Sequence, residues 1–209
     1  MGTMQKPALD SSDKMILERQ NLINFIKQAL EMPDNIAIGI ANNFEPISIS
    51  KNNFLLKKGE ICSKYLFLEK GFIRAYTFDL DGNEVTMNFY GQNSIVFEVA
   101  SYIKRTPSQE NFQALTDCSG WIGNFNTFKK LFHTIPEFRE FGRIILVNGF
   151  IALKERTLSM INLSAEKRYE ILLKSEKEII QNASIKHIAS YLGITDTSLS
   201  RIRKEIISK

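Results

Sequence analysis

Hydrophobic residues recur along this chain with two different periods, one typical of helices and one typical of strands. From Ile16 to Leu30 the apolar side chains fall close to helical spacing. Pro33 then stands where a second helix would begin. We therefore expect two helices, over residues 12–31 and 34–44, in front of the main body of the chain.

From about residue 45 to residue 124 the pattern changes to short apolar, β-branched or aromatic runs separated by glycine-containing turns. The segment Asp81-Gly82-Asn83 is a hairpin signal, because its residues tolerate the backbone angles that tight turns need. Short strands at this regular spacing are typical of a β-sandwich or a jelly roll. A short helix over 97–103 is predicted to lie among the strands.

A long helix is predicted after a brief one over 126–133. Pro136 suits the first turn of this helix, and its middle, from Ile144 to Leu153, is apolar nearly all round. Such a helix is expected to be buried on more than one side, against the sandwich and against a partner subunit. Burial within a single chain is the alternative.

Residues 185–204, IKHIASYLGITDTSLSRIRK, fit two helices that meet at a tight turn. Ala189 suits the point where the helices cross, and Gly193 suits a left-handed turn residue. The first helix needs an apolar inner face, for which we predict Ile185, Ile188 and Leu192.

The second helix of this pair has matching features. Ile194 can enter the core, Thr195 can cap the helix, and Asp196 is favourable near its positive end. Its apolar inner face consists of Leu199 and Ile202, which are three residues apart. Together these features predict a helix-turn-helix, whereas an ordinary helical hairpin packed on the core is the alternative.

The outward face of the second helix then carries residue types that contact DNA. We predict Arg201 as a bidentate partner of a guanine base, and Arg203 and Lys204 as phosphate contacts. Hydroxyl groups near the start of the helix serve either as caps or as DNA contacts. The complete predicted DNA-binding set is Thr195, Asp196, Thr197, Ser200, Arg201, Arg203 and Lys204.

The distribution of charge slightly favours a nucleic-acid partner. Residues 164–209 hold nine Lys and Arg against six Asp and Glu, a net charge of +3. Residues 1–163 hold eighteen against seventeen, a net charge of +1. A basic region attracts polyanions, although a solvated surface is the alternative explanation.

Composition excludes several other classes of protein. Cys62 and Cys118 lie far apart, and with two histidines the chain lacks the ligands of a zinc or iron–sulfur site. No apolar run is long enough to span a membrane, and the start does not read as a secretory signal, so we expect a cytoplasmic protein with no membrane partner. The phosphate-loop, dinucleotide and nucleophile-elbow motifs are absent and residues 45–125 contain no histidine, so no enzyme activity is expected.

Two stretches, KKGEICSKYLFLEKGFIRAYTFDLDGNEVTMNFYGQN and IKHIASYLGITDTSLSRIRKEI, resemble the Crp/Fnr family of regulators over roughly residues 30–207. The resemblance implies an α+β chain with an N-terminal, cyclic-nucleotide-binding-like antiparallel jelly roll flanked by helices. It also implies a sensor over residues 1–134, a long dimerisation helix over 135–163 and a helix-turn-helix domain over 164–209. Duplex DNA, a second copy of the chain and RNA polymerase are the partners it suggests.

The chain departs from the family pattern where cyclic nucleotides bind. Glu98 falls on the position of the family's ribose-binding glutamate, but Phe97 replaces the preceding glycine. Ser108 and Gln109 occupy the positions of the phosphate-binding Arg-Ser or Arg-Thr pair, and Arg105 lies nearby in sequence. A buried cyclic phosphate without a matched cation is costly, so we expect a small-molecule effector other than cAMP.

The DNA-reading end also differs from the family. Arg201 matches the arginine placed on guanine, whereas Asp196 and Thr197 replace an Arg and a Glu at other base-reading positions. We therefore expect an operator that differs from those of the family members with Arg and Glu at these positions. Many members add a β-hairpin wing after this helix, and because the sequence ends at Lys209 we expect no DNA contacts from such a wing. The resulting function is a dimeric, effector-modulated transcription regulator. The alternative is a ligand-binding or protein-interaction module that does not bind DNA by itself.

Overall fold

The structure is a computed structural model that describes residues 16–207. Two helices come first, α2 (Gln20–Ala29) and α3 (Asp34–Ala41). They agree with the two predicted helices, except that residues 12–15 lie outside the described part. Their buried apolar residues belong to the same hydrophobic core as those of the sheets.

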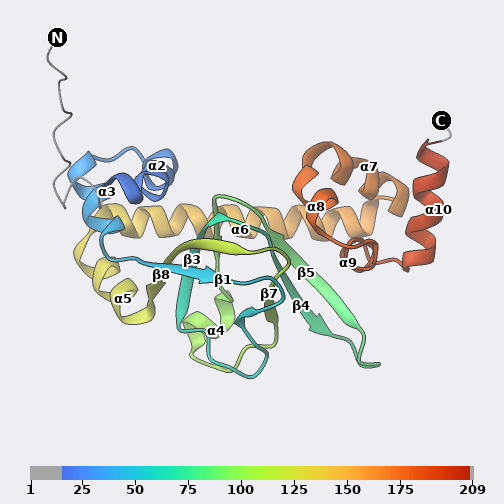
Figure 1. Cartoon of the computed structure of the whole chain (residues 1–209), viewed down its shortest axis with the longest axis horizontal. Coiled ribbons are helices and arrows are strands. Elements are labelled where there is room, and N and C mark those ends of the chain that lie inside the picture. Colours follow the sequence, from blue (N-terminus) through green and yellow to red (C-terminus); the bar gives the residue numbers. More distant parts are fainter. Residues whose placement is uncertain (1–15, 208–209) are drawn as a thin grey trace, which may run out of the picture.

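Within the described residues the strands form two four-stranded antiparallel sheets that face each other, as Figure 1 shows. One sheet has the order β1-β8-β3-β6 and the other has the order β2-β7-β4-β5. The predicted α+β class with an antiparallel jelly roll is confirmed. The strands are β1 (Glu45–Ile49), β2 (Phe54–Leu56), β3 (Lys64–Lys70), β4 (Ile73–Phe78), β5 (Glu84–Tyr90), β6 (Ser94–Val96), β7 (Asn111–Ala114) and β8 (Cys118–Asn124).

Strand β3 is buried on both of its faces, which explains its continuous apolar run. Leu66, Phe67 and Leu68 are all inaccessible to solvent or nearly so. The ring of Phe25 on α2 lies 4.8 Å from the ring of Phe67, and it also contacts Phe141 at 6.0 Å. Helices α2 and α6 (Pro136–Asn162) therefore cover the outer face of this sheet.

The predicted hairpin joins β4 and β5. Gly82 has φ +82°, and the Asp79 carboxylate accepts hydrogen bonds from the backbone N–H groups of Asp81 and Asn83. The hairpin extends away from the sandwich toward the C-terminal half of the molecule (Figure 1). The inserted helix is α4 (Val99–Lys104).

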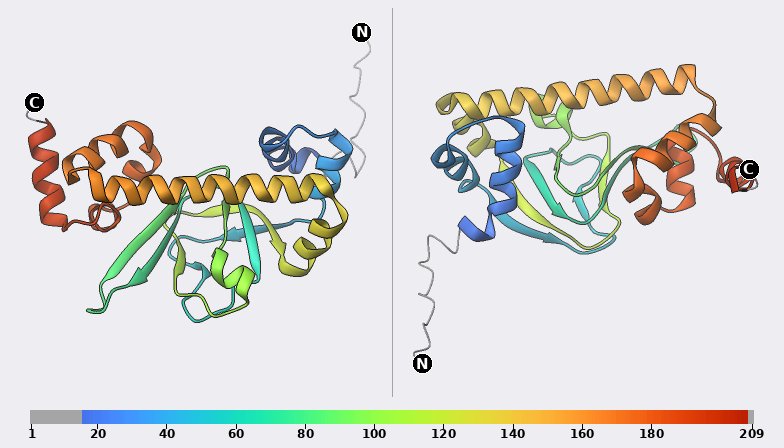
Figure 2. Two further views of the ribbon diagram at one scale, coloured as in Figure 1. Left: turned by 180° about the vertical axis from the view of Figure 1, so that it is seen from behind. Right: turned by 90° about the horizontal axis from the view of Figure 1, so that it is seen from above.

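Helix α5 (Phe125–Thr134) leads into the long helix α6, which runs along most of the length of the molecule in both views of Figure 2. At 1.5 Å per residue its 27 residues extend about 40 Å. Only Phe138 and Phe141 of α6 are buried. Burial of its apolar middle within one chain is therefore wrong, because residues 146–153 are exposed.

Four helices follow at the far end of α6: α7 (Ala165–Ser175), α8 (Lys177–Asn182), α9 (Ile185–Tyr191) and α10 (Asp196–Ile207). Ser164 caps α7 by accepting a hydrogen bond from the N–H of Lys167, as its sequence position indicates. These helices, which we call the head, share one buried cluster with Phe72, Phe89 and Leu115 of the sandwich. The division of the chain at residues 134 and 163 stays a prediction.

Candidate nucleic-acid interface and its junction with the sandwich

The turn between α9 and α10 depends on Gly193. Its φ of +69° lies in the left-handed region, where a side chain is strained. The N–H of Gly193 donates to the carbonyl of Ser190, and the N–H of Ile194 donates to the carbonyl of Ala189. These bonds satisfy the end of α9 and reverse the chain toward α10.

The two helices pack through small and aliphatic residues. Ala189 and Leu199 are almost completely buried, and Ile188, Leu192 and Ile202 join the same cluster. Ile185 was predicted on this inner face, but it is 40% exposed. It is the first residue of α9, where the helix has not yet reached its packing partner.

Helix α10 begins with a compact cap. The N–H of Ser198 donates to the Thr195 hydroxyl at 3.2 Å, and that hydroxyl also lies 2.9 Å from the Ser198 hydroxyl. The N–H of Thr197 donates to the Asp196 carboxylate. Thr195 is thus a capping residue, one of the two roles that its sequence position allowed.

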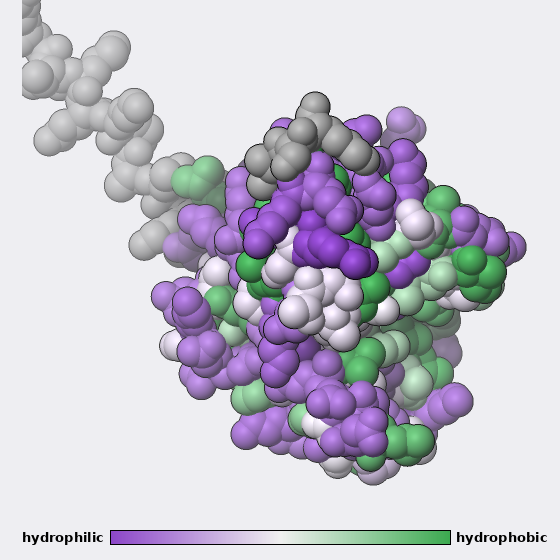
Figure 3. All heavy atoms as spheres, turned by 90° about the vertical axis from the view of Figure 1, so that its right-hand side faces the viewer, coloured by the Kyte–Doolittle hydropathy of each residue, from purple (hydrophilic) through white to green (hydrophobic). Residues whose placement is uncertain are grey.

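The predicted DNA-contacting residues gather on the outer side of α10. Exposed side chains are those of Thr195, Asp196, Thr197, Ser200, Arg201 and Lys204, whereas Arg203 is half-buried. The Arg201 side chain is 77% exposed and lies 3.9 Å from Glu205, a surface pair that water screens. Figure 3 views this end of the molecule, where hydrophilic residues dominate the middle of the surface.

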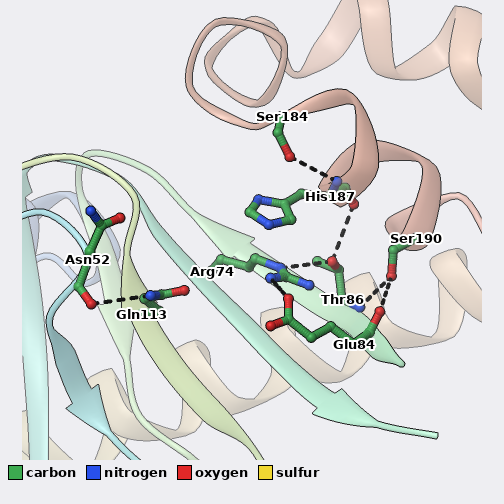
Figure 4. A network of polar contacts seen from close by, with 8 residues as sticks. All are labelled: Asn52, Arg74, Glu84, Thr86, Gln113, Ser184, His187 and Ser190. Carbon is green, nitrogen blue, oxygen red and sulfur yellow. Dashed lines mark hydrogen bonds and ion pairs between the residues drawn. The ribbon is translucent and has the colours of Figure 1, made fainter. Parts of the chain in front are cut away.

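A polar network ties α9 to strand β5 of the sandwich (Figure 4). The N–H of Thr86 donates to the Ser190 hydroxyl at 2.8 Å, and that hydroxyl donates to the Glu84 carbonyl at 3.0 Å. The Thr86 hydroxyl donates to the His187 carbonyl at 3.2 Å. We call this set of contacts the junction; it binds the first helix of the pair to strand β5 of the sandwich.

A buried arginine supports the junction from below. Arg74 on β4 is 1% exposed; its Nε donates to the Thr86 hydroxyl, and its guanidinium pairs with Glu84 at 2.6 Å. His187 lies above this pair, and its Nδ1 is buried with no hydrogen-bond partner in the described part of the chain. Burial, followed by the nearby Arg74 charge, lowers the pKa of His187 below its usual 6.5.

Two further arginines bind the last carbonyls of α9. Arg156 of α6 donates to the carbonyl of Tyr191 at 3.0 Å and to that of Thr86 at 3.4 Å. Its guanidinium also stacks 4.5 Å from the Tyr191 ring. Arg168 donates to the carbonyl of Leu192 at 2.7 Å. Cations suit the negative end of a helix. Through these contacts α9 is joined to α6, to α7 and to strand β5 of the sandwich.

The predicted effector residues are mostly engaged with the backbone around them. Both carboxylate oxygens of Glu98 accept hydrogen bonds from the start of α4. Arg105 stacks on Phe125 at 4.3 Å and donates to the Cys62 carbonyl, and the buried Ser108 hydroxyl donates to the Glu110 carbonyl. Gln109 is exposed.

A cavity of about 210 Å³ lies beside Glu98. Phe97 and Glu98 line it, whereas Arg105, Ser108 and Gln109 do not. Its charged lining residues are Glu60, Lys64 and Glu98. The structure thus brings together two of the five predicted effector residues, in a cavity whose charged lining consists of two carboxylates and one lysine.

The junction was not predicted from the sequence. Arg74 within the apolar strand IRAYTF was the available signal, because a charged residue in a doubly covered strand needs a partner. The partners of Arg74 are Thr86 and Glu84, which both lie on β5. Thr86 in turn donates to the carbonyl of His187 on α9, 101 positions away.

Several structural findings bear on other classes of function. Cys62 and Cys118 are buried free thiols, and burial raises the pKa of each. Among residues 16–207, no group of three or more His, Cys, Asp or Glu side chains is arranged to hold a metal ion. The same residues include no helix with the length and hydropathy of a membrane span.

Comparison with known proteins gives the fold a family context. Residues 46–134 match the model of the cyclic nucleotide-binding domain. No curated protein matches the sequence of this chain. Three solved structures that it resembles are described here.

A transcriptional regulator of the Crp/Fnr family from Eubacterium rectale is 16% identical, with a TM-score of 0.69 and 88% of each chain covered. FixK2 from Bradyrhizobium japonicum is 16% identical, with a TM-score of 0.68 over 79% of this chain and 85% of that one. The c-di-GMP-responsive regulator CLP of Xanthomonas campestris is 15% identical, with a TM-score of 0.66 over 83% and 90% of the chains. The chain therefore carries a cyclic nucleotide-binding domain in a fold that it shares with transcriptional regulators of the Crp/Fnr family.

Proposed function

We propose that this chain is a sequence-specific DNA-binding transcription regulator that acts as a dimer and responds to a small-molecule effector. The observation that carries the proposal is the outer face of α10. This face is polar and exposed. The short helix α9 packs against α10 across the turn at Gly193, which has a left-handed backbone conformation. A helix that enters a major groove requires such an exposed face and such a support. Arg201 is our choice for the base contact and Lys204 for a phosphate contact.

Dimerisation is supported by the exposed apolar side of α6. Leu146, Phe150, Leu153 and Ile161 are all more than 40% exposed, and they recur at intervals of three, four or eight residues along one helix. A contiguous apolar face of this kind marks an interaction site in a folded protein. A second copy of the same helix would cover it and would present two heads, as palindromic DNA sites require.

Coupling between sensor and head is supported by the junction. Arg156 of α6 donates one hydrogen bond to the Thr86 carbonyl on strand β5 and one to the Tyr191 carbonyl on helix α9. A shift of the sensor strands relative to α6 would therefore change the position of α9, and with it the position of α10. An effector that binds one arrangement better than the other would shift the equilibrium between them.

The chemistry around Glu98 supports an effector other than cAMP. The Glu98 oxygens already accept bonds from α4, and the cavity beside it contains a second carboxylate, Glu60. RNA polymerase remains a candidate further partner once DNA is bound.

DNA binding is tested by selecting bound duplexes from a random pool and measuring affinity at several salt concentrations. Arg201→Ala should weaken binding to the selected site by about 1–3 kcal/mol and relax base preference at one position of each half-site. Arg143→Ala is the matched control, because Arg143 is an exposed arginine near the start of α6, far from the head in sequence. The affinity of the wild-type chain should fall as salt rises.

Equal losses in the two arginine variants would contradict the assigned role of α10. Failure of the wild-type chain to select any duplex, with and without a ligand bound to the sensor, would favour the alternative module that does not bind DNA.

A further inference from the structure

The hydroxyl groups at the start of α10 bind one another. The Thr195 hydroxyl donates to the Ser198 hydroxyl at 2.9 Å and accepts from the Ser198 N–H at 3.2 Å. A hydroxyl has one proton and two lone pairs, so Thr195 keeps one lone pair for a third partner. The Thr197 hydroxyl lies 3.3 Å away and fills that place as the donor.

The Thr197 side chain therefore has its methyl group left for a partner outside the helix. Its hydroxyl and methyl groups are bonded to the same Cβ atom, and the hydroxyl is directed back toward Thr195. Because the side chain is exposed, its remaining branch is accessible to a partner. Thr197 thus adds a small apolar group to the otherwise polar outer face of α10.

Thr197 shares this face with Arg201. Residues four apart are neighbours on a helix surface, with Cβ atoms about 5–6 Å apart. Both side chains are exposed. In a helix that enters a major groove, the residues near its N-terminus contact base edges, and Thr197 is the second residue of α10. A base pair close to the one that Arg201 contacts is therefore within reach of Thr197.

The major groove has one apolar feature that distinguishes the four bases. Thymine alone has a methyl group, on C5, whereas the other base edges differ in their hydrogen-bond donors and acceptors. A threonine methyl is one of the side-chain groups that contact it. The Asp196 carboxylate beside Thr197 accepts a hydrogen bond from the Thr197 N–H, which holds the first turn of α10 in place.

We propose that Thr197 is a specificity-determining residue that selects a thymine, through contact between its methyl group and the C5-methyl group of the base. That thymine lies on either strand, next to the guanine that Arg201 contacts. The proposal rests on the proposed function, because it needs α10 in a major groove, and it adds the base at a second position of each half-site.

The test uses the full chain and the duplex that it selects from a random pool, with affinity measured by fluorescence anisotropy at constant salt. Each thymine of the site is replaced in turn by deoxyuridine, which removes only the methyl group. Next to the guanine identified with Arg201→Ala, this change should weaken binding by about three- to fivefold, as expected for one buried methyl group. Thymines elsewhere in the site are the controls.

Two substitutions of Thr197 separate its two groups. Thr197→Ser keeps the hydroxyl and removes the methyl, so it should bind the thymine and deoxyuridine duplexes equally well. Thr197→Val keeps a methyl and removes the hydroxyl, so it should still prefer thymine at that position. Both variants retain the Thr195 hydroxyl as the cap of α10.

A preference for thymine that persists in Thr197→Ser would overturn the proposal, as would its loss in Thr197→Val. A selected site without a thymine next to that guanine, or one that tolerates deoxyuridine there, would overturn this proposal and leave the proposed function intact. A wild-type chain that selects no duplex would overturn both.

Discussion

The two halves of α6 have similar apolar content but opposite surroundings. Near its start, Phe138 and Phe141 are 2% and 5% exposed and pack against aromatic rings of α2 and α5. Farther along, Phe150 and Ile151 are 67% and 46% exposed. The start of the helix is covered by its own chain, whereas from Leu146 onward the helix has apolar residues that the chain does not cover.

A phenylalanine in this helix therefore has one of two roles, and a sequence pattern alone does not separate them. Burial of an apolar side chain is favourable whether the covering surface comes from the same chain or from another. The two cases differ in experiment, because only cover by another chain depends on protein concentration. The predictions below use that difference.

The largest effect is expected from Phe138→Ala. Truncating a fully buried phenylalanine leaves a cavity among the rings of α5 and α6, and should lower the free energy of unfolding by about 3–5 kcal/mol. Urea unfolding followed by far-UV circular dichroism measures this loss. Phe150→Ala is the control, and its unfolding should change much less in the dissociated chain.

A smaller effect is expected from Phe150→Glu, and it should appear in association. A charge placed in the proposed two-fold contact would be buried without a partner, so the dimer should weaken by about a hundredfold or more. Sedimentation velocity over a range of concentrations measures the dissociation constant. Glu155→Lys offers a charge change on an exposed polar residue of the same helix for comparison.

Both outcomes are needed to keep the two roles apart. An unchanged dissociation constant in Phe150→Glu would remove α6 as the dimer contact. A concentration-dependent loss of stability in Phe138→Ala would show that the first half of the helix also depends on a partner.

In the exposed half of α6, Arg156 donates hydrogen bonds to carbonyls of β5 and α9 in the same chain. The third prediction therefore tests the junction. Thr86→Val keeps the shape of the side chain but leaves Arg74 Nε and the His187 carbonyl without their partner. We expect a loss of about 1–3 kcal/mol, with faster amide exchange in α9. Hydrogen exchange by mass spectrometry measures it, and Thr77→Val, which removes an exposed hydroxyl bond to the Gln109 carbonyl, is the control. Equal exchange in the two variants would exclude the junction as the restraint on the head.

The helix-turn-helix could be predicted because its determinants are local. The turn at Gly193, the cap at Thr195 and the inner residues Leu199 and Ile202 all lie within one short segment. The error at Ile185 has the same origin, because periodicity does not say where along a helix its packing partner begins.

The junction depends on long-range packing, and the sequence did not predict it. Thr86 and Ser190 stand 104 positions apart, and nothing near either residue indicates the other. The predicted effector residues met the same limit, since only Phe97 and Glu98 line the same cavity.

The smallest effect is a pH dependence of the junction through His187. Burial and the Arg74 charge lower the pKa of this histidine in the folded chain, while Glu84 opposes them and Lys186 adds to them. The unfolded chain therefore binds more protons than the folded chain below pH 6.5, and stability must fall as pH decreases through that value. His187→Gln removes the titrating group, so the difference in unfolding free energy between wild type and variant should change below pH 6.5 and stay constant above it. A difference that is constant across the whole range would mean that the imidazole is equally solvated in both states, and that α9 does not rest on the Arg74 pair as Figure 4 draws it.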